Sequence, residues 1–105
     1  MIKVKRNLNK IVITGHAGFA DYGRDIVCAS ASSIVITSIN AALRIDKNSL
    51  SYKEEKDKLT IEVLSDNEIV QKIIENMLAM LEELADTYQK NIQIIKEERP
   101  WILWN

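Results

Sequence analysis

Hydrophobic and polar residues alternate in two parts of the chain in the pattern of paired strands. Ile2 and Val4 alternate with lysines, residues 7–10 have turn chemistry, and an apolar, β-branched run follows at 11–14. A second alternating pair, at 50–52 and 59–63, flanks the charged segment 54–57. These patterns predict two hairpins, each with one buried face.

A helix is expected between the two hairpins. Asp25 is a preferred N-cap residue, and the periodicity that follows it predicts a helix from Ile26 to about Arg44. The β-branched run 34–37 would also suit a strand, but the cap and the spacing favour a helix. Some apolar residues lie beside the face expected to cover the sheet. They suggest a homodimer interface that includes Ile36, Ile39 and Leu43.

A second helix and a final strand complete the predicted order. Ser65 and Glu68 have the spacing of a capping box, and apolar residues recur with helical spacing from 70 to 88. A strand is expected at 92–95, ending before Pro100. The order ββαββαβ predicts a single α+β domain over 1–105, a two-layer sandwich with two helices on a largely antiparallel sheet.

Composition excludes several classes of function. The 105 residues are 47% hydrophobic and 28% charged, and the formal net charge of −1 gives no positive field for general nucleic-acid binding. We find no apolar run of the roughly 20 residues that cross a bilayer and no signal peptide, so we expect a cytoplasmic protein without a membrane partner. One cysteine and one histidine exclude an internal disulfide and a multi-thiolate zinc site, and we expect neither metal nor cofactor.

The cysteine and the histidine are expected at neighbouring ends of elements. If Asp25 is the N-cap, Cys28 lies in the first turn, where free N–H groups and the helix dipole stabilise a thiolate. His16 follows the end of a strand and is joined to this helix by the loop 16–24. The pair therefore predicts nucleophilic catalysis, with backbone N–H groups of the helix start stabilising the oxyanion. The alternative is a buried hydrophobic cysteine and a structural histidine.

The segment 15–32, GHAGFADYGRDIVCASAS, contains Gly-His-Ala, five further residues, Gly-x-Asp-Ile-Val-Cys-Ala and a nearby Ser. It resembles the signature of the ribosomal-processing cysteine protease family Prp, and departs from it at Ser30 and Ala31, where that family usually has Ala and Val. The resemblance implies that Cys28 is the nucleophile and His16 the general base. It also implies a substrate, the N-terminal extension of a large-subunit ribosomal protein such as bL27, cut after an aromatic residue in a short apolar motif.

The other candidate residues have more than one interpretation. Asp25 either orients His16 as a third catalytic residue or caps the helix, or does both. Ser32, one turn after Cys28, either contacts the substrate backbone or allows close packing. Gly18 and Gly23 are expected to be hinges of a loop that covers the peptide. The remaining candidates for substrate binding are Gly15, Ala17, Gly23, Phe19 and Tyr22.

A second hypothesis of a different class is a non-enzymatic module that binds a ribosomal protein or assembly intermediate, with Cys28 merely buried. Fast alkylation of Cys28 that depends on His16 would favour the enzyme. Trp101 and Trp104 are expected to dock against the sheet or a partner subunit.

Overall fold

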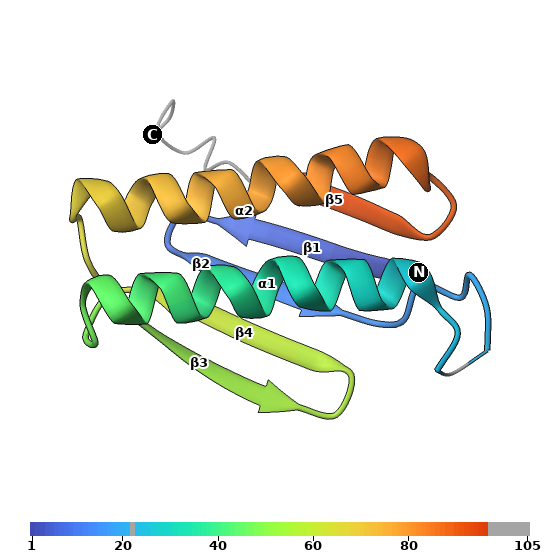
Figure 1. Ribbon diagram of the computed structural model, residues 1–105, viewed down its shortest axis with the longest axis horizontal. Helices are drawn as coiled ribbons and strands as arrows, with labels where there is room; N and C mark the ends of the chain where they lie inside the picture. Colours follow the sequence, from blue (N-terminus) through green and yellow to red (C-terminus); the bar gives the residue numbers. More distant parts are fainter. Residues whose placement is uncertain (22, 97–105) are drawn as a thin grey trace, which may run out of the picture.

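The computed structural model describes residues 1–21 and 23–96, and its elements follow the predicted order ββαββαβ. Tyr22, Pro100, Trp101 and Trp104 lie outside the described residues. Five strands and two helices are present in the described part of the chain (Figure 1): β1 (Ile2–Asn7), β2 (Lys10–Thr14), α1 (Ile26–Ile45), β3 (Leu50–Glu55), β4 (Lys58–Val63), α2 (Glu68–Thr87) and β5 (Ile92–Lys96).

The strands form one sheet in the order β3-β4-β2-β1-β5. The hairpins β1–β2 and β3–β4 and the pair β2–β4 are antiparallel, whereas β5 runs parallel to β1, so the expected largely antiparallel sheet is confirmed. Each hairpin is closed by a two-residue turn with one residue in the left-handed region, Leu8 with φ 56° and Asp57 with φ 59°. The charged turn is therefore shorter than the predicted segment 54–57.

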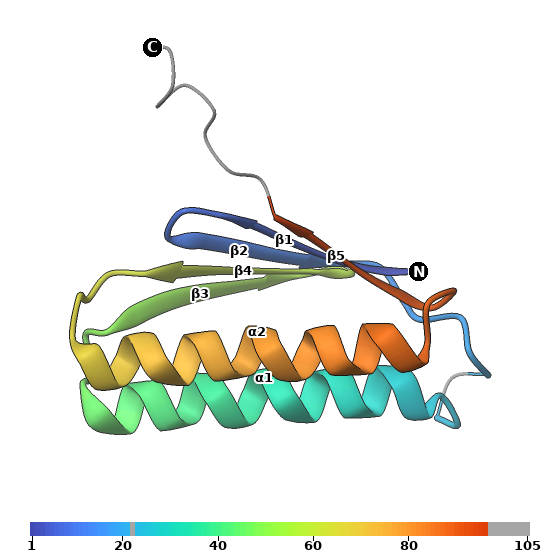
Figure 2. The ribbon, with the colours of Figure 1, turned by 90° about the horizontal axis from the view of Figure 1, so that it is seen from above.

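Both helices lie side by side on one face of the sheet, which gives the two predicted layers (Figure 2). The core between the layers contains fully buried side chains from both, including Val4, Ile11 and Ile61 of the sheet and Val27 and Met77 of the helices. Alternation along the strands and helical periodicity along α1 and α2 direct these residues to the same space. Burial of that apolar surface holds the two layers together.

The start of α2 differs from the prediction. The N-cap is Asn67, whose side-chain oxygen accepts hydrogen bonds from the N–H groups of Ile69 (2.8 Å) and Val70 (3.2 Å). The predicted capping box of Ser65 and Glu68 is wrong, because Glu68 is the first helical residue rather than the third. Ser65 instead accepts a hydrogen bond from the Asn67 N–H.

Ile39 was expected on the second apolar surface of α1, and this placement is wrong. Ile39 is only 6% exposed and belongs to the core, because it follows Val35 by four residues on the buried stripe of the helix. Ile36 is 58% exposed, and Leu43 is half-buried. Only part of the predicted interface is therefore accessible.

The expectation that no segment is long and apolar enough to cross a bilayer is also wrong. By length and composition alone, α1 meets that criterion. Core helices of water-soluble proteins meet it as well, and one stripe of α1 is buried against the sheet and α2. The composition of α1 is consistent with this packing.

Candidate active site

Cys28 lies in the first turn of α1, and Asp25 caps that helix as predicted. One carboxylate oxygen of Asp25 accepts hydrogen bonds from the N–H groups of Val27 (3.0 Å) and Cys28 (2.9 Å). The bond from Cys28 is the main reason that the pKa of the Asp25 carboxyl is lowered from its ordinary value of 3.8. The cap fixes the direction of the first turn, and with it the position of the Cys28 side chain.

The second oxygen of Asp25 holds the preceding loop. It accepts hydrogen bonds from the N–H groups of Phe19 (3.0 Å) and Ala20 (3.5 Å). Asp25 therefore accepts hydrogen bonds from four backbone N–H groups, and its carboxylate does not hydrogen-bond to His16. This geometry supports the capping role of Asp25.

The Cys28 sulfur accepts a hydrogen bond from the N–H of Ala17 at 3.2 Å. Ala17 is only 2% exposed, and its carbonyl oxygen accepts a hydrogen bond from Nδ2 of Asn91 at 3.0 Å. The carbonyl of Asn91 in turn accepts the N–H of Ile2 at 2.9 Å. A line of hydrogen bonds thus connects the thiol to the start of β5. Sequence reasoning missed Asn91, which is 74 residues from Ala17 and belongs to no local motif.

His16 lies just beyond the end of β2, beside the turn between β3 and β4. Its Nε2 is 2.6 Å from Oδ1 of Asp57, and the N–H of Gly15 donates to the Asp57 carbonyl oxygen at 3.1 Å. The two segments meet because Thr14 of β2 pairs with Lys58 of β4. Sequence reasoning missed Asp57 also, although a prediction that β2 pairs with β4 would have brought it beside His16.

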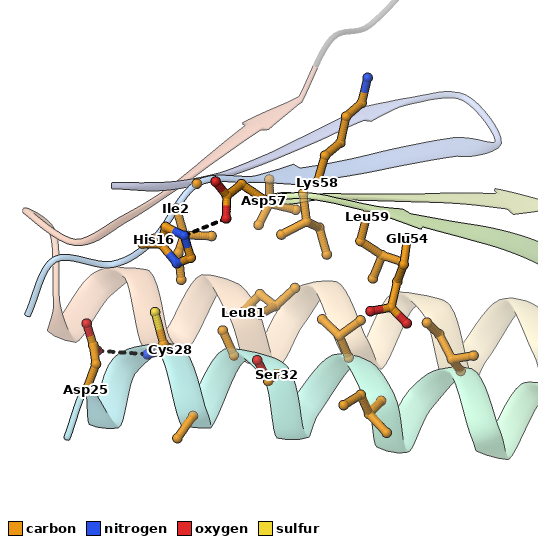
Figure 3. A pocket seen from close by; sticks show the side chains of 18 of the residues that line it. Ile2, His16, Asp25, Cys28, Ser32, Glu54, Asp57, Lys58, Leu59 and Leu81 are labelled. Carbon is orange, nitrogen blue, oxygen red and sulfur yellow. Dashed lines mark hydrogen bonds and ion pairs between the residues drawn. The ribbon is translucent and has the colours of Figure 1, made fainter. Parts of the chain in front are cut away.

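Figure 3 shows His16 and Cys28 facing each other from the two layers, with His16 on the sheet side and Cys28 on α1. The second ring nitrogen of His16, Nδ1, lies on the side of the ring that faces Cys28. Among the described residues, the His16 ring is hydrogen-bonded to the Asp57 carboxylate, and the Cys28 sulfur accepts from the backbone N–H of Ala17. The layers therefore bring the predicted pair to one place without a hydrogen bond between them.

Glycine is required at Gly15 for two reasons. Its φ of +86° lies in the left-handed region, and a Cβ added there would overlap the carbonyl oxygen of Met1. Gly18 and Gly23 also have positive φ, but a Cβ at either would meet open space. The backbone of Met1 thus packs so closely against Gly15 that no side chain fits where the loop leaves β2, directly before His16.

A groove of about 1040 Å³ begins at His16 and Cys28 and continues between α1 and the β3–β4 hairpin. Gly15, Gly23 and Ser32 line this groove, as expected of residues near a bound peptide. Two other predicted contacts are placed elsewhere: Ala17 is buried in the hydrophobic core, and the Phe19 ring packs edge-on against Tyr88 with centroids 5.4 Å apart. Further along, the lining is mostly apolar, with Val35, Ile36 and Ile39 from α1, Leu59 from β4 and Leu81 from α2.

The expected oxyanion donors at the start of α1 are in part occupied. The N–H groups of Val27 and Cys28 donate to Asp25, so the prediction is wrong for these two groups. The N–H of Ala17, in contrast, points at the reactive sulfur itself. Within residues 1–21 and 23–96, no three His, Cys, Asp or Glu side chains are grouped as metal ligands.

Comparison with known proteins shows that most of the chain is similar to cysteine proteases of the Prp family. The family model of the cysteine protease Prp matches residues 1–93. The ribosomal processing cysteine protease Prp of Staphylococcus aureus is 31% identical over 87 residues, covering 80% of this chain and 82% of that protein. That of Mycoplasma genitalium is 30% identical over 98 residues, covering 93% and 97%.

Solved structures agree with the sequence comparisons. The S. aureus ribosomal processing protease Prp with a covalently linked product peptide superimposes with a TM-score of 0.87 at 27% identity, covering 92% of this chain and 100% of that one. The same protease with a substrate peptide gives a TM-score of 0.81 at 26% identity, with the same coverage. Both of those structures hold a peptide.

Proposed function

The chain belongs to the cysteine protease Prp family and is a cysteine protease, and we propose that it removes the N-terminal extension of a large-subunit ribosomal protein such as bL27. The observation that carries this proposal is the placement of Cys28 and His16 on facing layers at one end of a groove. A reactive thiol, a base and an adjoining apolar channel are the parts that peptide cleavage requires. The names of the relatives in S. aureus and M. genitalium support the ribosomal substrate.

The groove suits an extended peptide. Its lining on α1 runs from Cys28 to Asn40, which at about 1.5 Å per residue is a length of roughly 18 Å. An extended chain advances about 3.3 Å per residue, so about five substrate residues would fit beside the helix. We assign these to the apolar and aromatic residues ahead of the cut, with Ser32 beside the substrate backbone.

The chemistry follows from the two facing side chains. In the proposed reaction, the His16 imidazole takes the proton from the Cys28 thiol, and the thiolate attacks the carbonyl carbon of the scissile bond. The N–H of Ala17 donates to the sulfur, and we assign it to stabilising the Cys28 thiolate. His16 then protonates the leaving amine as the C–N bond breaks, which leaves a thioester on Cys28. A water deprotonated by His16 attacks this thioester, the C–S bond breaks, and His16 returns the proton to the Cys28 sulfur as the acid product leaves.

We further propose a single-domain cytoplasmic enzyme that acts as a homodimer and contacts neither nucleic acid nor membrane. The half-buried Leu43 of α1, outside the groove lining, supplies apolar surface for a second copy, and the exposed Ile36, which also lines the groove, lies about two turns earlier on the helix. The net charge of −1 supports the absence of a nucleic-acid partner.

The test is to mix the purified protein with the unprocessed ribosomal protein and to determine the masses of the products. We expect one cut after an aromatic residue, no cut with Cys28→Ala or His16→Ala, and retained binding by Cys28→Ala. Thr37→Ala, an exposed change on α1 outside the groove lining, is the matched control and should cut normally. Binding without cleavage by the unchanged protein, together with slow alkylation of Cys28 that does not depend on His16, would favour the non-enzymatic alternative.

A further inference from the structure

The β3–β4 turn holds Asp57 in a fixed place beside His16. The turn has two residues, and Asp57 adopts a φ of 59°, which aspartate and asparagine tolerate better than most side chains. Its carbonyl oxygen is bonded to the N–H of Gly15, and the neighbouring Lys58 is paired with Thr14. The backbone next to His16 and the backbone of Asp57 are thus joined directly, which limits where the carboxylate can lie.

The contact between the two side chains selects one form of the imidazole. A carboxylate has no proton to donate, so the nitrogen that faces Asp57, Nε2, must carry the hydrogen. In a neutral ring the other nitrogen, Nδ1, is then unprotonated, and it is the nitrogen on the side of Cys28. Only an unprotonated nitrogen can accept the thiol proton.

We propose that Asp57 is the residue that positions His16 for catalysis, by holding Nε2–H and leaving Nδ1 free to act on Cys28. This inference rests on the proposed function of the Cys28 and His16 pair. Asp25, the acidic residue within the sequence motif, already accepts hydrogen bonds from four backbone N–H groups and does not hydrogen-bond to His16. The orienting carboxylate therefore comes from the β3–β4 turn of the sheet, 41 residues along the chain from His16.

A purely structural role for the pair is poorly supported by its surroundings. The side chains of His16 and Asp57 are 68% and 46% exposed, and ion pairs so open to water contribute little to folding stability. Loss of the carboxylate should therefore reduce turnover while leaving the unfolding midpoint nearly unchanged. That combination separates a positioning residue from a stabilising one.

The variants can be chosen to preserve the turn. Asp57→Gly removes the carboxylate and tolerates positive φ, and Asp57→Asn keeps a side-chain oxygen that can accept from Nε2–H. Lys56→Ala, in the same turn and outside the groove lining, is the matched control. With the ribosomal-protein substrate, we expect Asp57→Gly to lower kcat roughly tenfold or more with KM changed about twofold at most. Asp57→Asn should also lower kcat, because its amide NH2 can donate to Nε2 and favour the form with the hydrogen on Nδ1.

A spectroscopic measurement tests the inference without relying on cleavage. His16 is the one histidine in the chain, so labelling histidine with nitrogen-15 gives a single imidazole spectrum. At about pH 9, where a histidine is ordinarily neutral, the unchanged protein should show mainly the Nε2–H form, and Asp57→Asn should show a larger share of the Nδ1–H form. Asp57→Gly should show a mixture of both forms, and Lys56→Ala should match the unchanged protein.

The possible outcomes separate the two proposals. An Nδ1–H form in the unchanged protein, or a spectrum and kcat that Asp57→Gly leaves unaltered, would overturn the role of Asp57. The expected spectra together with no cleavage of any ribosomal protein would overturn the proposed function but keep the Asp57 contact. His16→Ala should not cut, so the rate of Cys28 alkylation is compared in that background. There, Asp57→Gly should cause no further slowing, and additional slowing would also contradict the positioning role.

Discussion

Replacing Gly15 with alanine should damage both the fold and the active site. The alanine would keep a φ of +86°, which costs roughly 1–2 kcal/mol for a residue with a Cβ. Its Cβ would also overlap the carbonyl oxygen of Met1, and because both partners belong to the backbone, relief requires a shift of the chain. By analogy with overpacked cores, that shift adds about 1–3 kcal/mol. The total loss of unfolding free energy is therefore about 2–5 kcal/mol.

Gly18→Ala is the matched control, because Gly18 also has a positive φ, +69°, but no atom lies within 4 Å of an added Cβ. It should lose only the backbone cost, roughly 1–2 kcal/mol. The difference between the two variants isolates the overlap with Met1. With a urea dependence of about 1.5 kcal/mol/M, a loss of 3 kcal/mol lowers the midpoint by about 2 M and a loss of 1 kcal/mol by about 0.7 M.

The assay combines urea unfolding, followed by circular dichroism, with cleavage measured under conditions where each variant stays folded. We expect Gly15→Ala to lose more cleavage than Gly18→Ala, because Gly15 adjoins His16 and donates its N–H to Asp57. Equal midpoints for the two variants would refute the argument from overlap. A large loss of stability in Gly15→Ala with full cleavage by its folded fraction would show that the site tolerates the shift.

Three further predictions concern the surroundings of the site. Asn91→Ala should lower the free energy of unfolding by about 1–3 kcal/mol, because the buried Ala17 carbonyl loses its hydrogen-bond partner. It should also slow the alkylation of Cys28, because the Ala17 N–H is no longer held at the sulfur, and unchanged alkylation would count against this. The pKa of Asp25 is lowered on folding, so its stabilising effect is complete above about pH 4 and is lost as the pH falls through the folded-state pKa. The urea midpoint of the unchanged protein should therefore fall more between about pH 6 and pH 3 than that of Asp25→Asn, and parallel falls would contradict the assignment. Ile36→Asp should give folded monomers by sedimentation, whereas Ile39→Asp should unfold the protein, since it places a charge in the core. A folded Ile39→Asp variant would show that this position is not core.

Local sequence patterns predicted the order of the strands and helices, and they also predicted the placement of Cys28, His16 and the Asp25 cap. Alternation and periodicity located the strands and helices because each depends on neighbours within a few residues along the chain. The cap at Asp25 was predictable for the same reason, since its acceptors and donors lie within three residues of one another. The capping box at Ser65 failed by two positions, because the helix begins at Glu68 and it is Asn67 whose side chain accepts the N–H groups of Ile69 and Val70 in the first turn.

The contacts that complete the site were not predictable from such patterns. Asn91 reaches Ala17 across 74 residues, and Asp57 reaches His16 across 41. Both contacts depend on which strands become neighbours in the sheet, and the alternation within one strand does not identify its neighbour. Ile39 was misplaced for a related reason: both faces of α1 are apolar, so composition alone did not distinguish the buried stripe from the exposed one.

The hydrophobic core nevertheless determines the position of the orienting carboxylate. In the observed register Ile11 pairs with Ile61 and Ile13 with Leu59, and the side chains of these pairs face the helices. A slip of one residue would turn one member of each pair toward solvent, so burial strongly favours the observed alignment of β2 and β4. That alignment places the β3–β4 turn beside the end of β2, and hence Asp57 beside His16. The same apolar alternation that predicts the strands therefore fixes, through their register, a polar contact that the sequence motif does not contain.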